Sequence, residues 1–108
     1  MFMEKRQFTR IELTTSVRST VCIGNITFNG FVDNLSIKGM MFKSSYQIPL
    51  NEIMSITIFP SEDNSDIQLK TEGKAVRNVN AGVGVCFNKP EHDLFEKFIK
   101  IALLKMSI

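Results

Sequence analysis

The sequence predicts an all-β domain with one C-terminal helix, in which six strands form a closed antiparallel β-barrel. Three observations predict this class. Apolar and polar residues alternate from residue 11 to 23, several short apolar segments separated by turn residues follow up to residue 87, and the apolar spacing then becomes helical. Many short strands in succession favour a closed barrel, because closure removes exposed strand edges. The length of 108 residues suits one domain.

The alternation is clearest in the first predicted strand. Its apolar residues share odd-numbered positions: Ile11, Leu13, Val17, Val21 and Ile23. This pattern predicts a strand with one buried face. Gly24-Asn25 then supplies a two-residue hairpin turn, and a second strand runs from Ile26 to about Leu35. Gly30 within it indicates a bulge or a close backbone approach.

Four more segments complete the predicted barrel. They share β-branched and aromatic residues bounded by turn residues: Met40 to about Ser44, Ile53 to Phe59, Ile67 to Val79, and Val83 to Phe87. The long segment from Ile67 alternates imperfectly, and we expect Gly73 to break its register.

A helix is predicted from Pro90 to about residue 106. Pro90 suits the first helical position, and acidic residues in the first turn complement the helix dipole. Apolar residues that recur on one face are expected to cover an open part of the barrel: Leu94, Phe95, Phe98 and Ala102.

The end of this helix carries apolar residues on more than one face: Ile99, Ile101, Leu103, Leu104, Met106 and Ile108. A helix that is apolar on several sides is normally buried on several sides. Two interpretations follow. The surplus is either a frayed terminus with exposed apolar residues or a docking surface for a protein partner or a second copy of the chain, as in a homodimer.

Composition excludes several classes of partner. Thirteen Lys and Arg against eleven Asp and Glu give a net charge of +2, too weak a field to indicate binding to nucleic-acid polymers or membrane surfaces. No apolar run approaches the roughly 18 residues that cross a bilayer, and the start lacks a signal-peptide pattern, so membrane insertion is not expected. Cys22 and Cys86 lie in strand-like contexts and are predicted to be reduced, buried thiols. A cytoplasmic location is expected.

No residues form a catalytic constellation. The single histidine, His92, falls on the polar face of the predicted helix, and Asp63 and Asp66 lie in a polar loop without basic or nucleophilic neighbours. The cysteine and histidine pattern does not match a metal site, and the Gly82-Val83-Gly84 segment lacks the context of a phosphate-binding loop. The chain is therefore not expected to be an enzyme or to use a catalytic cofactor or metal.

Two short segments could bind an anionic ligand. Arg6 and Arg10 are four residues apart, directly before the first strand. Their planar guanidinium groups can bind phosphate or a guanine edge through two hydrogen bonds and can stack on a base. The second segment is the turn Asn34-x-Ser36-x-x-Gly39, which offers an amide, a hydroxyl and a site of close backbone approach. Taken alone, the first would be a solvated basic tail and the second an ordinary turn.

Together and in this order, the two segments resemble the PilZ domain family, whose signatures are RxxxR and [D/N]xSxxG. The resemblance extends along most of the chain. Gly30-Phe31-Val32 looks like the second strand of the family, and the segments 82–87 and 88–91 look like its last strand and helix entry. The five signature positions all agree with the family pattern.

The resemblance implies a six-stranded barrel of PilZ type that binds the second messenger cyclic di-GMP. It implies that Arg6 and Arg10 hold phosphates and guanine edges, that Asn34 and Ser36 meet other guanine edges or phosphate oxygens, and that Gly39 keeps the turn open. Residues 1–10 would be a flexible arm and residues 11–108 the barrel with its helix. Many members carry arginine where this chain has Lys5, which bears on nucleotide stoichiometry.

The leading hypothesis is thus a cyclic di-GMP receptor that relays the messenger level to a protein partner in motility, biofilm formation or a related output. The alternative is a PilZ-like adaptor that acts through protein contacts without nucleotide. A third class, a small barrel for single-stranded nucleic acid, needs exposed aromatic residues along a basic groove. Most of the nine Phe and one Tyr occupy positions that look internal, which disfavours this class.

Overall fold

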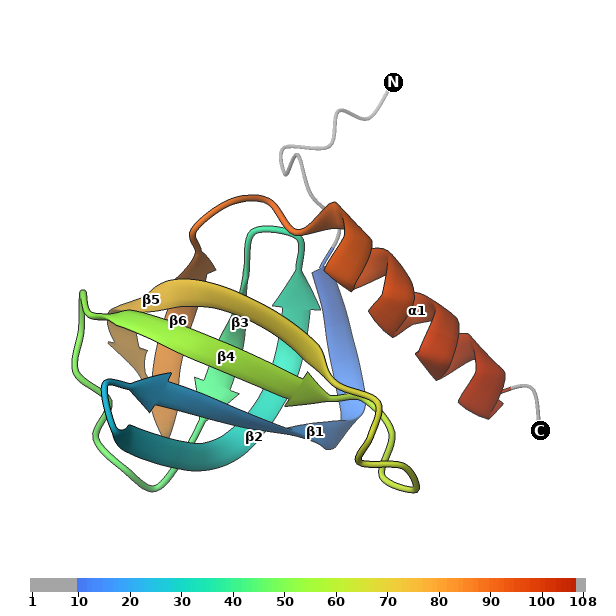
Figure 1. The fold of residues 1–108 in the computed structure, drawn as a ribbon, viewed down its shortest axis with the longest axis horizontal. Coiled ribbons are helices and arrows are strands. Elements are labelled where there is room, and N and C mark those ends of the chain that lie inside the picture. The colour runs from blue at the N-terminus through green and yellow to red at the C-terminus, as the bar shows by residue number, and fades with distance from the viewer. Residues whose placement is uncertain (1–9, 107–108) are drawn as a thin grey trace.

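Six antiparallel strands close into a barrel, and one helix follows them (Figure 1). The computed structural model describes the backbone of residues 10–106 and the side chains of residues 17–101. The elements are β1 (Arg10–Ile23), β2 (Ile26–Ser36), β3 (Gly39–Lys43), β4 (Ile53–Phe59), β5 (Leu69–Val79), β6 (Gly82–Phe87) and α1 (His92–Met106). The predicted arm therefore lies outside the described residues except for Arg10, which is the first residue of β1.

The strand order around the barrel is β1-β2-β3-β6-β5-β4, and β1 also pairs with β4. Each strand consequently has a hydrogen-bonded neighbour on both sides, which confirms the predicted fold class. The Gly24-Asn25 hairpin turn between β1 and β2 is also confirmed, since Ile23 pairs with Ile26. Strand β5 begins at Leu69 and not at Ile67, because the Ile67 amide donates a hydrogen bond to the Asn64 carbonyl within the preceding turn.

The core fills the barrel with apolar side chains from all of the strands. Phe42, Leu35 and Met54 are completely buried, and most other core residues also alternate with exposed residues along their strands. Ser19 on β1 is a polar residue that is also completely buried. Its buried hydroxyl donates a 2.8 Å hydrogen bond to the Thr57 carbonyl on the neighbouring strand β4, so no polar hydrogen is left unpaired there.

Helix α1 packs on the barrel through one apolar face. Leu94 and Phe98 are 5% and 3% exposed and belong to the core, and Phe95 packs against it. The helix begins at His92, so the prediction that Pro90 is the first helical residue was wrong. The Glu91 amide donates to the Ile37 carbonyl of the β2–β3 turn, while the Glu91 carbonyl accepts the first helical bond from Phe95 at 3.0 Å. Glu91 is therefore the N-cap.

The predicted role is confirmed for Gly30 and wrong for Gly73. Gly30 is a close approach, as predicted, because an added Cβ atom would collide with the Lys43 carbonyl oxygen. Gly73 does not break the register of β5, since it pairs regularly with Met54 and Phe87 and is needed where the Cys86 carbonyl approaches. The register shift on β5 lies instead between Ala75 and Arg77.

Both cysteines are free thiols, but neither is buried. Cys22 is half-buried and Cys86 is exposed. Cys86 alternates with the buried residues Val85 and Phe87, so it faces outward. The prediction of buried thiols was wrong because the apolar run of β6 does not show which residues face inward.

Truncation of the helix anchor should destabilise the whole fold. We expect Phe98→Ala to lower the free energy of unfolding by about 3–5 kcal/mol, because it leaves a cavity between α1 and the barrel. The matched control is Lys97→Ala on the exposed face of the same helix turn, which should change it by less than about 0.5 kcal/mol. Chemical denaturation measures both. Equal midpoints for the two variants would contradict the packing described.

Candidate functional site

The pairing of β1 with β2 brings Arg10 of the first predicted segment beside the turn between β2 and β3. Strand β2 ends at Ser36 and β3 begins at Gly39, so Ile37 and Lys38 form the reversal. Arg10 is the backbone partner of Ser36, and Glu12 is the partner of Asn34. Thus the second arginine of the first segment starts a strand that is hydrogen-bonded to the second segment. Arg6 lies outside the described residues.

Ser36 is buried and stabilises its own turn. Only 3% of the residue is exposed to solvent. The hydroxyl accepts a hydrogen bond from the Lys38 amide at 3.2 Å and donates to the Gly39 carbonyl at 3.5 Å. The serine hydroxyl therefore stabilises the turn whether or not a ligand is bound. Its contact with a nucleotide stays a prediction.

Glycine at position 39 is likewise required by the fold. It pairs with Cys86 on β6, and an added Cβ atom would collide with the carbonyl oxygen of Val85. Only a residue without a side chain lets β6 approach the end of the turn this closely. The sequence suggested that glycine keeps the turn open for a ligand, and the structure adds that glycine is needed for barrel closure.

Asn34 lies on the outer face of β2, where it is half-buried. Its neighbour Leu35 points into the core and is completely buried. The pairing of β2 with β3 shifts between Val32 and Asn34, so Asp33 is an extra residue at a bulge. Without this bulge, strict alternation after the buried Val32 would turn Asn34 inward.

Backbone hydrogen bonds join the turn to the last strand and to the helix. The Phe87 amide donates to the Lys38 carbonyl and the Glu91 amide donates to the Ile37 carbonyl, both at 2.8 Å. The Glu91 carboxylate in turn accepts a 2.6 Å hydrogen bond from the Thr71 hydroxyl on β5. Figure 1 shows the β2–β3 turn beside the segment that leads from β6 into α1. Sequence reasoning missed this link, because backbone bonds between distant segments leave no residue pattern.

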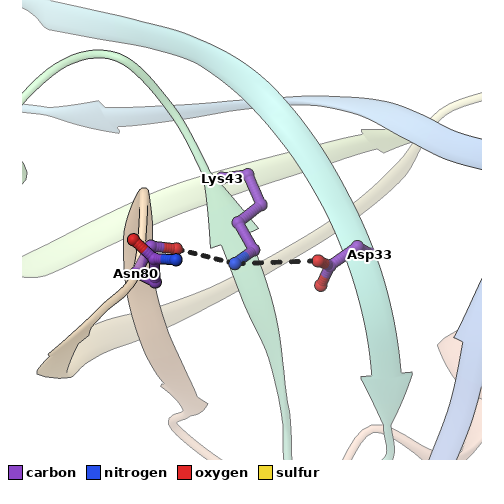
Figure 2. Close-up of polar contacts among 3 residues, drawn as sticks. All are labelled: Asp33, Lys43 and Asn80. Carbon is purple, nitrogen blue, oxygen red and sulfur yellow. Dashed lines mark hydrogen bonds and ion pairs between the residues drawn. The ribbon is translucent and has the colours of Figure 1, made fainter.

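A charged cluster lies beside Asn34. Figure 2 shows the Lys43 ammonium group between Asp33 and Asn80. Its Nζ donates to the Asn80 carbonyl at 2.7 Å and lies 3.8 Å from Oδ2 of Asp33. Oδ1 of Asp33 is buried and has no hydrogen-bond partner among the described residues. Lys43 thus offsets the charge of the carboxylate next to Asn34, which lowers its repulsion of an anion.

A polar groove of about 550 Å³ lies beside Glu91, whose amide bonds to the turn. Its lining comes from β5 and from the segment between β6 and α1: Lys70, Thr71, Glu72, Asn88, Lys89 and Glu91. Two lysines and two glutamates balance one another, so the groove does not favour an anion by charge. Among the described residues, no group of three or more His, Cys, Asp and Glu side chains could hold a metal ion. No helix within the described part of the chain is long and apolar enough to cross a membrane.

The comparison with known families decides the identity of this fold. The model of the PilZ domain family matches residues 4–102, which includes both signature segments. The chain belongs to the PilZ domain family. PilZ domains are non-catalytic receptor domains, in agreement with the expectation that the chain is not an enzyme.

Solved structures support the PilZ fold. The Bacillus subtilis inhibitor of motility (MotI/DgrA) matches with a TM-score of 0.67 and 14% identity over 97% of this chain. This chain spans only 53% of that protein. An uncharacterised Legionella protein matches with a TM-score of 0.54 and 14% identity, over 92% of this chain and 96% of the other. No curated protein matches the sequence. At this identity the structures show the shared fold alone.

Removal of the Ser36 hydroxyl should loosen the turn. Ser36→Ala leaves the Lys38 amide without its hydroxyl acceptor, and we expect a loss of about 1–3 kcal/mol in the free energy of unfolding. Ser45→Ala, at an exposed serine after β3, is the matched control and should be neutral. Thermal unfolding measures stability, and amide exchange at Lys38 should accelerate. An unchanged exchange rate at Lys38 would show that the hydroxyl does not hold the turn.

Proposed function

We propose that this PilZ domain is a receptor for cyclic di-GMP and relays the level of the messenger to a protein partner. The observation that carries the proposal is the register of β1 against β2. It sets Arg10 opposite Ser36, while the bulge at Asp33 turns Asn34 to the outer face of the same hairpin. Both family signatures are complete in the sequence, and the pairing of Arg10 with Ser36 supports a site shared between them.

The proposed roles follow from side-chain chemistry. Arg6 and Arg10 would bind phosphate oxygens and guanine Hoogsteen edges through charge-assisted, two-pronged hydrogen bonds and stack on the bases. Asn34 can both donate to and accept from a guanine edge. Ser36 and Gly39 would hold the turn in the shape that the ligand meets. Lys43 would keep the carboxylate of Asp33 from repelling the phosphates.

The relay is proposed to use the connection between the turn and α1. A ligand that contacts residues 36–39 would shift the Lys38 and Ile37 carbonyls. These carbonyls accept hydrogen bonds from the Phe87 and Glu91 amides. A protein partner, or a second copy of the chain, would then recognise the loaded face together with α1. Motility and biofilm formation are the proposed outputs, and the cytoplasm is the proposed location, since cyclic di-GMP is an intracellular messenger.

Calorimetric titration with cyclic di-GMP tests the receptor function. Arg6→Ala and Arg10→Ala should each weaken binding about ten- to a hundredfold, because each removes a charge-assisted contact. The matched control is Arg18→Ala. Arg18 lies on the same strand as Arg10 but eight residues away, with its guanidinium 4.0 Å above the Phe59 ring, and its removal should leave affinity within about twofold.

The outcomes separate the two candidate functions. A titration of the wild-type protein that gives no heat, with no nucleotide-dependent change in the amide spectrum, would overturn the receptor function. It would favour the adaptor that acts through protein contacts alone.

A further inference from the structure

A row of four residues crosses the outer wall of the barrel and starts at the signature asparagine. Asn34 on β2 pairs with Met41 on β3, Met41 pairs with Gly84 on β6, and Gly84 pairs with Arg77 on β5. The next residues along these strands, including Leu35, Met40 and Val85, are buried in the core. The row therefore faces outward on the same wall as the turn.

A bulge places Arg77 in this row. Along β5, Leu69, Gly73 and Ala75 face inward, so strict alternation would also turn Arg77 inward. The register shifts between Ala75 and Arg77, which makes Val76 an extra residue and reverses the facing of Arg77. The bulge at Asp33 does the same for Asn34. Bulges commonly re-aim a side chain near a functional site.

The missing side chain of Gly84 leaves room for Arg77 to lie across β6. A Cβ atom on Gly84 would lie 2.9 Å from Nε and 3.2 Å from Cγ of Arg77. The arginine and Met41 line the same shallow hollow of about 150 Å³. Arg77 is exposed, and its guanidinium forms no hydrogen bond and no ion pair with another described residue. No described residue therefore competes with a ligand for these donors.

The distance suits a dinucleotide. Three strand spacings of about 4.8 Å separate Asn34 from Arg77, or about 14 Å along the curved wall of the barrel. The Arg77 side chain shortens this gap because it extends over Gly84. A cyclic dinucleotide carries two purine rings joined by ribose and phosphate groups, and one end held at Asn34 leaves the other end above Met41 and Gly84.

We propose that Arg77 is a further nucleotide-binding residue outside both signatures, holding a phosphate or purine edge at the far end of the row from Asn34. This inference rests on the proposed receptor function. Arg77 is a planar, permanently charged group that lies over the backbone of Gly84, and no described residue occupies its donors. Such a group suits both phosphate and a base edge. Met41 supplies an apolar, polarizable surface for the face of a base.

The test compares three variants by calorimetric titration with cyclic di-GMP. Arg77→Ala should weaken binding about tenfold or more. Arg77→Lys keeps the charge but loses the planar fork, and its affinity should fall between those of wild type and Arg77→Ala. Lys70→Ala removes one positive charge from the other end of β5, where Lys70 pairs with Thr57 of β4, and should bind within about twofold of wild type.

A second measurement uses the wild-type protein, so its result does not depend on whether a variant folds. In ¹⁵N-arginine-labelled wild-type protein, the Nε–Hε resonance assigned to Arg77 should shift on saturation with the nucleotide, while that of Arg18 should not. If the wild-type protein binds but Arg77→Ala keeps wild-type affinity, or the Arg77 resonance does not shift, this inference is overturned. The receptor function then remains intact. A wild-type protein that does not bind would overturn both.

Discussion

Closure of the barrel is the constraint on which the rest of the structure depends. Because β1 pairs with both β2 and β4, and β3 pairs with β6, every strand is hydrogen-bonded on both sides. A strand in this position cannot slide by one residue without turning its core residues to solvent. The burial of Leu35 and Val85 therefore determines the facing of every neighbouring residue, including those that could meet a ligand.

Bulges reconcile this constraint with an outer binding wall. Asp33 and Val76 are each an extra residue in their strands, and each lies directly before a polar side chain that faces outward as a result. Val32 and Leu35 stay buried on either side of the bulge at Asp33, and Ala75 stays buried directly before the bulge at Val76. The cost is local, since one residue at each bulge leaves the regular ladder. Val76 accordingly stays 48% exposed despite being apolar.

The signature turn combines folding and recognition. Ser36 satisfies its own turn, and Gly39 lets β6 close against β3, so these two positions would be required even without a ligand. A buried hydroxyl needs hydrogen-bond partners, and here the turn itself supplies them. A complete signature is therefore evidence of the turn conformation first, and the ligand contacts depend on the side chains around it.

The sequence by itself determined the class of the fold. Alternation in β1, the Gly24-Asn25 turn and the helical spacing after Pro90 are local patterns, and backbone geometry converts each of them directly into an element. The two signature segments were likewise visible, because their residue types and spacing lie within short stretches. The proximity of Arg10 to the second segment followed from the hairpin between them.

Only the tertiary structure decided which residues face outward and what joins the turn to the helix. Register shifts depend on how a strand pairs with its neighbour, which the residue pattern of one strand does not show, so no local pattern places the irregularity at Val76 and not at Gly73. The exposure of Cys86 follows from the same register. The start of α1 was misplaced because the Glu91 amide bonds to the Ile37 carbonyl, a contact between backbones that any residue types could make. The sequence did not indicate Arg77 as a binding residue, because its side chain lies across Gly84 only when β5 and β6 are paired.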